Sequence, residues 1–295
     1  MSNVVRTLWG AGLQSNLFLK TPYVVLPFTT LNEKHEIQKG VLPAAGETPT
    51  ELLFVMGVGG HYYEDNATGI PKIKYYRHEP DHAALFRQLP MIRRLLSNDL
   101  TQEQRRQYAG RKVVTVNGIK YVEYWAKRLD LSNVETKYWK IITTNGVEDT
   151  KPCIPDSTNL NPNPKKIPAD SQVSTSNVKL AVSSIIKIQL TPFDVSEWLS
   201  VCNQVLGDPD FGIVSEMALV SGVDKVVQAE SSSGTFNFKE VIAQQITSFL
   251  DARYDLIGSN LGVEKVLDLG DAELLMTGVT NLTGGVLPNS AVAGG

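Results

Sequence analysis

Alternation of apolar and polar residues is the clearest pattern in the second half of the chain. From Val178 to Leu190 every second residue is apolar except Ser184, and lysine and glutamine side chains fall on the opposite face. A period of two separates side chains onto the two faces of a strand. The pattern therefore predicts a half-buried strand over 178–190.

A helix is predicted directly after this strand. Thr191 and Pro192 interrupt the alternation, and Asp194 then stands at an expected N-terminal cap, with Glu197 three residues later. Apolar residues follow at the 3.6-residue spacing of one helix face, and Gly207 predicts a left-handed C-terminal cap. The next residues predict a strand, a turn and a return strand, at 211–220, at Gly222 with Asp224, and at 225–229.

The clearest hairpin of the first half covers 111–128. Asn117-Gly118 suits the positive dihedrals of a two-residue primed turn. That turn fixes the register, which pairs Val116 with Ile119, Val114 with Tyr121 and Lys112 with Glu123. A further strand over 134–143 leads to a second tight turn at Asn145-Gly146.

Residues 4–58 alternate short apolar runs with Gly and Pro, including runs at 16–20, 23–28 and 52–58. They predict short strands, which either form a β layer or lie extended along a neighbouring subunit. Helices are predicted from Pro80, from Pro90 and from Thr101 to Gly110, the last with a Thr101–Gln104 capping pair. This helical patch either covers a sheet or binds a partner.

The predicted fold class is α+β, predominantly antiparallel β with a few short amphipathic helices and β-sandwich-like layers. A Pro- and Asn-rich stretch at 151–172 predicts a linker or long loop between an N-terminal β-rich domain (1–150, with the helical patch at 80–110) and a C-terminal α+β domain (173–280). In that second domain a helix is predicted over 238–254, although Gln244, Gln245 and Thr247 would also suit an exposed strand face, and 263–269 and 273–279 predict short strands or a strand and a turn. Residues 281–295 predict a flexible tail, or one that docks on a partner. An insertion topology, with 60–150 interrupting one β domain, is the alternative.

Composition limits the classes of function. A net charge of −3 and a pI near 5.9 argue against a sequence-independent nucleic-acid binder, which needs a basic face. The densest basic group, Arg93, Arg94, Arg105 and Arg106, is interpreted as a solvated helix face, with an anionic partner as the alternative. Two cysteines make no disulfide framework, and Cys202 is expected to be an inert core thiol. The start of the chain resembles no secretion signal and no stretch suits a membrane span, so we expect synthesis in a cytoplasm.

Two stretches match, in part or in full, sequence motifs of enzymes. Gly57-Val58-Gly59-Gly60 follows an apolar strand but lacks the third glycine and the helix of a dinucleotide fingerprint, so a turn is expected. His78-Glu79-Pro80-Asp81-His82 matches H-E-x-x-H, which binds zinc only on a continuous helix. Pro80 opposes such a helix, and the two imidazoles are not expected to share a metal. We therefore predict no catalytic, cofactor-binding or metal-binding residues and no cofactor.

Strand aromatics gather in the middle of the chain and are expected in a core or subunit interface. A sugar-stacking platform is the alternative for these residues: Tyr121, Tyr124, Trp125, Tyr138 and Trp139.

Two stretches resemble structural proteins of tailed-bacteriophage particles. Residues 213–222, IVSEMALVSG, are similar to a strand phrase of baseplate and tail components. A second resemblance, to the start of uncharacterised phage structural proteins, covers residues 8–12, 22–28 and 41–47. Neither stretch carries a catalytic signature, so the resemblance implies a particle component without assigning functional residues.

The predicted function is that of a non-enzymatic subunit of a tailed-phage particle, in the baseplate wedge or tail. Expected partners are other virion proteins and copies of itself, with no nucleic acid and no membrane, and the expected location is the virion after synthesis in the host cytoplasm. The alternatives are a neck or collar protein, a host-surface glycan-binding module, and a zinc hydrolase.

Overall fold

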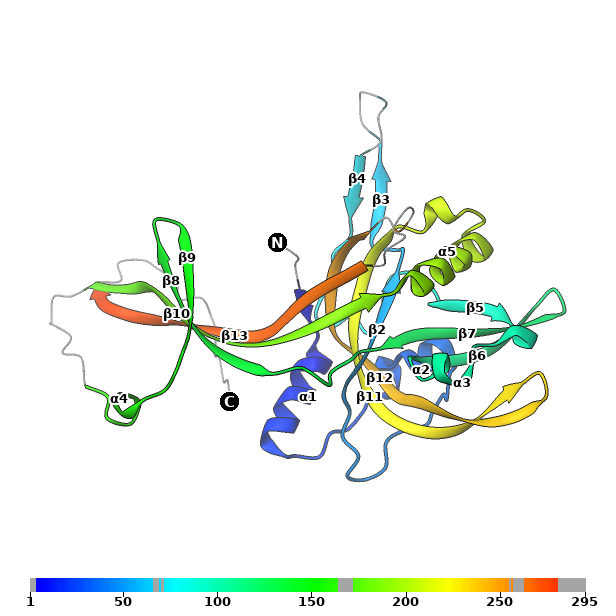
Figure 1. The fold of residues 1–295 in the computed structure, drawn as a ribbon, viewed down its shortest axis with the longest axis horizontal. Helices are drawn as coiled ribbons and strands as arrows, with labels where there is room; N and C mark the ends of the chain where they lie inside the picture. Colours follow the sequence, from blue (N-terminus) through cyan, green and yellow to red (C-terminus); the bar gives the residue numbers. More distant parts are fainter. Residues whose placement is uncertain are drawn as a thin grey trace. The chain divides into compact units, whose positions relative to one another are not determined.

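The computed structural model describes residues 4–65, 69, 72–163, 172–254, 256 and 263–280. The chain divides into two compact units (Figure 1). The first unit combines Met1–Leu129 with Ile188–Lys265, and the second combines Asp130–Lys187 with Val266–Gly295. The predicted tail at 281–295 lies outside the described residues.

The first unit is built on a seven-stranded antiparallel sheet. Its strands run in the order β1-β12-β11-β2-β7-β5, and β6 pairs with the other side of β7. The strands are β1 (Val4–Arg6), β2 (Thr50–Gly57), β5 (Ile92–Leu95), β6 (Tyr108–Val116), β7 (Ile119–Arg128), β11 (Val214–Ser231) and β12 (Gly234–Tyr254).

This sheet curls until β6 comes close to β12. The two strands share no ladder; the side chain of Glu240 on β12 instead accepts hydrogen bonds from the backbone amides of Gly110 (2.6 Å) and Arg111 (2.7 Å) on β6. Arg128 on β7 pairs with Asp224 on β11 at 2.7 Å. The curl encloses the main core, whose buried members are Leu31, Leu53, Val55, Leu85, Ala109, Ala126, Ala218, Val220, Val241, Ile246 and Phe249.

Short helices surround this sheet. Within the described ranges none is long and apolar enough to cross a bilayer. They are α1 (Leu8–Leu19), α2 (Leu31–His35), α3 (Gln102–Arg105) and α5 (Pro192–Leu206), with single 3₁₀ turns η1 (Pro27–Thr29), η2 (Leu96–Asn98) and η3 (Pro209–Phe211).

Helix α5 begins one turn earlier than predicted. Thr191 is the N-cap, and Asp194 is the third helical residue of its capping box instead of the cap itself. The same Asp194 carboxylate accepts from Tyr108 (2.5 Å) and pairs with Lys127, which fixes the helix against β6 and β7. Gly207 is the predicted left-handed cap, at φ 85°.

The second unit contains a four-stranded sheet in the order β13-β10-β8-β9. Its elements are β8 (Thr136–Thr144), β9 (Val147–Pro152), the helical turn α4 (Ser157–Leu160), β10 (Gln172–Leu190) and β13 (Val263–Thr280). The predicted turn at Asn145-Gly146 joins β8 to β9, with positive φ at both residues.

The predicted β-rich, predominantly antiparallel fold class is confirmed. The 111–128 hairpin forms in the predicted register, with Val116 opposite Ile119, Val114 opposite Tyr121 and Lys112 opposite Glu123. Asn117 and Gly118 both have the positive φ that the primed turn requires.

The predicted helical patch at 80–110 is wrong apart from α3 and η2. No helix starts at Pro80, and 92–95 form strand β5, which pairs with Tyr121–Tyr124 of β7. The helix expected to end at Gly110 stops at Arg105, because β6 begins at Tyr108. Residues 92–95 form a strand because they pair with the backbone of β7, and their local sequence does not show that this partner is available.

Four further element assignments are wrong. Residues 16–19 belong to helix α1, which Lys20 caps, 238–254 belong to strand β12, and the two short strands over 263–279 are one strand, β13. Strand β11 continues through Gly222, where a register shift replaces the expected turn. The β11–β12 ladder has register shifts, and Ala243 has a positive φ. These irregularities interrupt the alternation of apolar and polar residues along β12, so its apolar residues fall at a spacing that resembles that of a helix.

The two compact units differ from the division predicted at 151–172. The first unit takes strands from both sides of residues 151–172. Within 151–172, the described residues include the end of β9 and helix α4, and both belong to the second unit. The arrangement is an insertion, as in the alternative topology, but the inserted segment is 130–187.

Glu51 on β2 gives this fold a testable pH dependence. Both its oxygens lie within 2.9 Å of the single hydroxyl of Thr247, and burial raises the pKa of Glu51 to about 7 despite that hydrogen bond. A folded pKa above the unfolded value means that ionisation destabilises the fold as pH rises from about 4.5 to 7.

We therefore expect Glu51→Gln to stabilise the protein above pH 7, by up to about 3 kcal/mol, and to have little effect near pH 4.5. Urea unfolding of both proteins across this pH range measures the difference. A difference that does not grow with pH would show that Glu51 ionises normally.

Candidate functional site

The side chain of Glu216, on strand β11, is a buried anchor for two loops. It is 1% exposed. Oε1 accepts hydrogen bonds from the backbone amides of Gly59 (3.0 Å) and Arg87 (2.8 Å), and Oε2 accepts from the amide of Phe86 (2.9 Å) and from Nε2 of His78 (2.9 Å). Both oxygens are therefore fully hydrogen-bonded.

The glycines of the Gly57–Gly60 connection make room for this carboxylate. A Cβ on Gly57 would lie 2.5 Å from Oε1 of Glu216, and one on Gly60 would lie 2.4 Å from the carbonyl oxygen of Ser215. The amide of Gly60 also donates to the hydroxyl of Ser215 at 3.0 Å. The motif joins β2 to β3, as expected of a turn after a strand, and the glycines serve the close approach of β11.

His78 completes the anchor from the opposite loop. Its ring stacks between Phe86 (centroids 4.1 Å apart) and Phe249 (3.8 Å). Although burial alone would raise the pKa of Glu216, the hydrogen bonds from His78 and from the amides of Arg87 and Phe86 hold it below its ordinary value. The carboxylate thus stays ionised and bonded to fixed donors, an arrangement suited to holding backbone in place.

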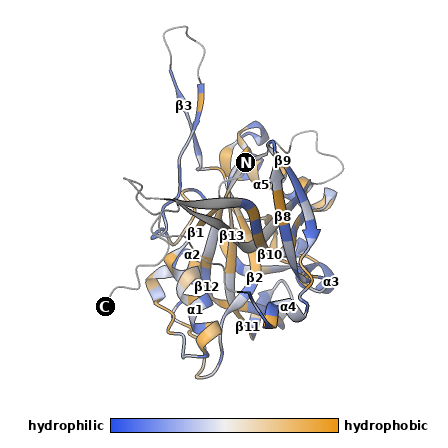
Figure 2. Ribbon diagram, turned by 90° about the vertical axis from the view of Figure 1, so that its left-hand side faces the viewer, coloured by the Kyte–Doolittle hydropathy of each residue, from blue (hydrophilic) through white to orange (hydrophobic). Residues whose placement is uncertain are grey.

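The anchor lies at the root of a projecting hairpin. Among the described strands, β3 (His61–Glu64) and β4 (Lys72–Tyr75) form a two-stranded sheet of their own, and Figures 1 and 2 show this hairpin standing clear of the seven-stranded sheet. We call this hairpin the arm. Gly60 and Tyr76 close its base through a backbone hydrogen bond of 2.9 Å.

The H-E-x-x-H motif lies in a loop, although its histidines do meet. His78 precedes a turn at Pro80-Asp81, and the Nδ1 atoms of His78 and His82 are 3.4 Å apart. The expectation that no helix carries the two residues is met, but the rings are neighbours in a T-shaped contact. Nε2 of His78 is directed at Glu216, and Nδ1 is the nitrogen of His78 that faces His82.

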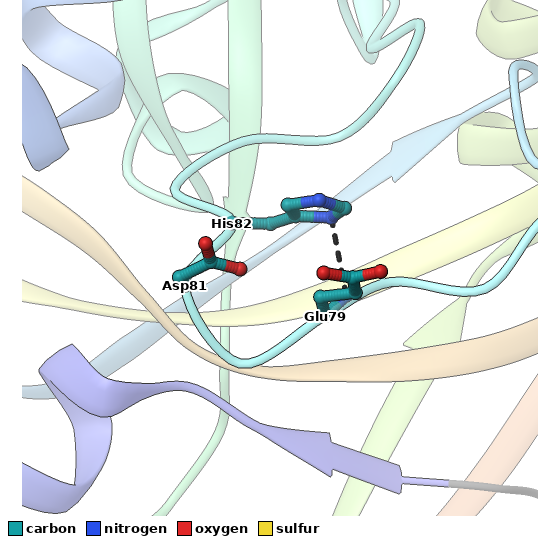
Figure 3. Close-up of side chains that lie close together, drawn as sticks. All are labelled: Glu79, Asp81 and His82. Atoms are coloured by element: carbon teal, nitrogen blue, oxygen red, sulfur yellow. Dashed lines mark hydrogen bonds between the residues drawn. The ribbon is translucent and has the colours of Figure 1, made fainter.

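Glu79, Asp81 and His82 form the cluster that could hold a cation (Figure 3). Their ligand atoms lie within 4.8 Å of one another, and both carboxylates are exposed. Nδ1 of His82, however, accepts a hydrogen bond from the amide of Glu79 at 3.1 Å. In a neutral imidazole this leaves the proton on Nε2, so neither nitrogen has a free lone pair for a metal. The geometry favours a hydrogen-bonded turn.

The predicted basic group does not form a helix face. Arg93 and Arg94 lie on β5 and pair with Glu123 (3.4 Å) and Glu197 (2.6 Å). Arg105 is on α3, and Arg106 is its exposed C-cap. The solvated-helix interpretation is therefore wrong for Arg93 and Arg94.

The five aromatic candidates are divided between the two units. Tyr124 is fully buried, and Trp125 stacks on His35 at 4.1 Å. Tyr138 and Trp139 belong to β8 in the second unit, and Tyr138 is exposed. Cys202 is buried as expected, and burial raises the pKa of its thiol to about 12.

Comparison with known proteins finds one family. A family model described as a family of unknown function (DUF7208) matches residues 1–283. The chain belongs to this family. No curated protein and no solved structure matches it. The matched region includes the Glu216 anchor and the arm.

Sequence reasoning did not identify the anchor. In the sequence, Glu216 belongs to the phage-like phrase at 213–222, and His78 belongs to the H-E-x-x-H motif. The sequence does contain one signal for the anchor, because Glu216 is the single carboxylate inside an otherwise apolar predicted strand. A carboxylate that is buried on folding needs several hydrogen-bond donors around it.

Glu216→Gln should destabilise the protein by about 3 kcal/mol, since either orientation of the amide sets an NH₂ group against two donors. The depressed pKa means that the carboxylate stabilises the fold above pH 4.5, the ordinary value, and that this contribution is lost as pH falls through the folded pKa. Urea unfolding at pH 7 measures the loss, and hydrogen exchange at the amides of Gly59, Phe86 and Arg87 should increase.

Glu103→Gln is the matched control, because Glu103 is an exposed carboxylate on α3. Equal effects of the two substitutions would show that the Glu216 hydrogen bonds contribute little.

His82→Ala tests the cation cluster. Because Nδ1 of His82 is hydrogen-bonded within the turn, we expect the wild type to retain no zinc and the variant to behave identically. Native mass spectrometry after incubation with zinc reports the bound metal. A stoichiometric zinc ion that disappears in His82→Ala would instead establish a metal site.

Proposed function

We propose that this protein is a non-enzymatic structural subunit of a tailed-phage particle, in the baseplate or tail, and that it acts by assembling with neighbouring subunits. The neck is the alternative location. The resemblance of residues 213–222 and of the N-terminal stretches supports the phage part of the proposal. The arm supports the assembly part.

One face of the arm is apolar and uncovered. Because directly opposed residues of an antiparallel pair share a face, the register places Tyr63 with Ile73 and His61 with Tyr75 on the same side. Tyr63 is 56% exposed and Ile73 is 45% exposed. Large apolar side chains paired on an exposed ribbon are typical of a contact surface.

The other face of the arm is largely charged. Glu64 lies opposite Lys72, and Glu64 also pairs with Lys74 at 3.3 Å. This face suits water, so the arm is amphipathic and has one side for a partner.

The anchor explains how such an arm keeps its direction. An isolated two-stranded hairpin is only marginally stable in water. Here Glu216 and Ser215 bind the connection that enters the arm, and Glu216 also binds the chain that leaves it, through Nε2 of His78. The base is thus rigid while the ribbon is exposed, which favours insertion against another subunit.

A second uncovered apolar region lies in the N-terminal segment. Phe18 and Phe28 are 86% and 87% exposed, and Val24 is 75% exposed. Such exposure exceeds what a monomer needs and supports a second contact surface.

Tyr63→Ser combined with Ile73→Ser should prevent incorporation into particles while the protein stays folded, because the anchor is untouched. The matched control is Glu64→Ser combined with Lys72→Ser, on the charged face. Complementation of a phage lacking the gene, followed by mass spectrometry of purified particles, measures incorporation.

Equal incorporation of the two double variants would contradict a role for the apolar face. If the wild-type protein is absent from purified particles, the phage part of the proposal fails whatever the arm does.

A further inference from the structure

A cavity of about 700 Å³ lies in the first unit, on the side of α3. One wall is the 96–106 segment, which contains η2 and α3. The other is the 231–239 segment, where β11 turns into β12. The volume is in the range of small-ligand sites. The cavity is separate from the Glu216 anchor, none of whose residues lines it.

The one carboxylate among the lining residues is already fully engaged. Oδ1 of Asp99 accepts from the amide of Leu100 (2.6 Å) and the hydroxyl of Tyr124 (2.7 Å). Oδ2 accepts from Arg111 at 2.9 Å and lies 3.7 Å from Arg105. Asp99 therefore has no free acceptor for a ligand.

Hydrogen-bond donors, in contrast, remain open. In the part of the chain that the structure describes, the exposed guanidinium of Arg106 makes no hydrogen bond or ion pair. Lys239 pairs with Asp224 but keeps 62% of its side chain exposed. Ser232, at the hairpin turn, adds an exposed hydroxyl. Guanidinium and ammonium groups can only donate, so a complementary ligand must supply acceptors.

Phe236 determines which kind of acceptor fits. The guanidinium of Arg105 lies 4.1 Å above its ring, so Arg105 covers one face of the ring. Proteins often hold an uncharged sugar by stacking it on an aromatic ring. Because Arg105 already covers this face of Phe236, a sugar cannot stack there. The same contact, together with a hydrogen bond from Nε of Arg105 to the carbonyl oxygen of Thr101 (3.4 Å), fixes the orientation of Arg105, whose terminal nitrogens can donate to oxyanions.

We propose that this cavity binds a small ligand carrying two or more oxyanion groups, either phosphates or carboxylates. Arg105, Arg106 and Lys239 supply the charge, and Ser232 supplies a hydroxyl. The protein as a whole carries a net charge of −3, so the positive cavity is a local feature and not a consequence of the overall composition. This inference is independent of the proposed assembly function.

Isothermal titration calorimetry of the full chain with pyrophosphate and with citrate tests the proposal. We expect saturable binding of at least one probe, weakened by added sodium chloride. Binding of pyrophosphate alone identifies a phosphate ligand, of citrate alone a carboxylate ligand, and of both a general oxyanion site.

Two variants with matched controls locate the binding. Arg106→Ala should weaken it about tenfold, the usual effect of losing one charge-assisted contact, whereas Arg77→Ala, which removes an exposed arginine outside the cavity lining, should not. Ser232→Glu should abolish binding, and the neutral Ser232→Gln of similar size should retain it.

Absence of saturable binding by both probes would overturn the proposal. Equal affinity of Arg106→Ala and the wild type, or of Ser232→Glu and Ser232→Gln, would do the same, because the anion would then bind elsewhere.

Discussion

The buried carboxylate of Glu216 holds together three segments that are distant from it in the sequence. It bonds to the Gly57–Gly60 connection, to the amides of Phe86 and Arg87, and to His78, all from one position on β11. Burying a carboxylate is costly, and four donors around two oxygens compensate that cost only if each donor is held in place. The glycines of the connection and the stacked ring of His78 meet this condition. The direction of the arm follows from these contacts.

The same solution recurs elsewhere in the first unit. Glu240 joins β12 to β6, where a regular ladder is missing, by accepting from the amides of Gly110 and Arg111. Asp194 joins α5 to β6 and β7 through Tyr108 and Lys127. In each case an acceptor-only side chain satisfies donors that the curled sheet would otherwise leave unpaired. The buried acidic side chains thus determine how β12 meets β6 in the curved sheet and where α5 packs against it.

Local signals predicted the features that depend on local chemistry. The hairpin at Asn117-Gly118 has the expected register, and Gly207 ends α5 as expected. Both features depend on residues that are adjacent in the sequence, because Gly and Asn favour positive φ and apolar alternation marks the strands. The conformation of 92–95 depends instead on a free position beside β7, and that of 238–254 on bulges opposite β11. The anchor was missed for a related reason: Glu216 and Arg87 are distant in sequence, and only the fold brings them together. His78 and His82 were not expected to share a metal, and the turn at Pro80-Asp81 brings their Nδ1 atoms to 3.4 Å from each other.

The insertion of 130–187 into the first unit constrains the order in which the chain can fold. Strand β1 pairs with β12, matching Val4 to Leu250, and β2 pairs with β11 beyond the inserted segment. A ribosome releases β1 and β2 long before β11 and β12 exist, so until then β2 can pair with β7, at Leu53 and Phe54, but not with β11. Pairings between such distant residues are slow to form and leave strand edges open to wrong partners in the meantime. The inserted residues 130–187, in contrast, contain the β8–β9 and β8–β10 pairings and can acquire structure while the surrounding unit is still being made.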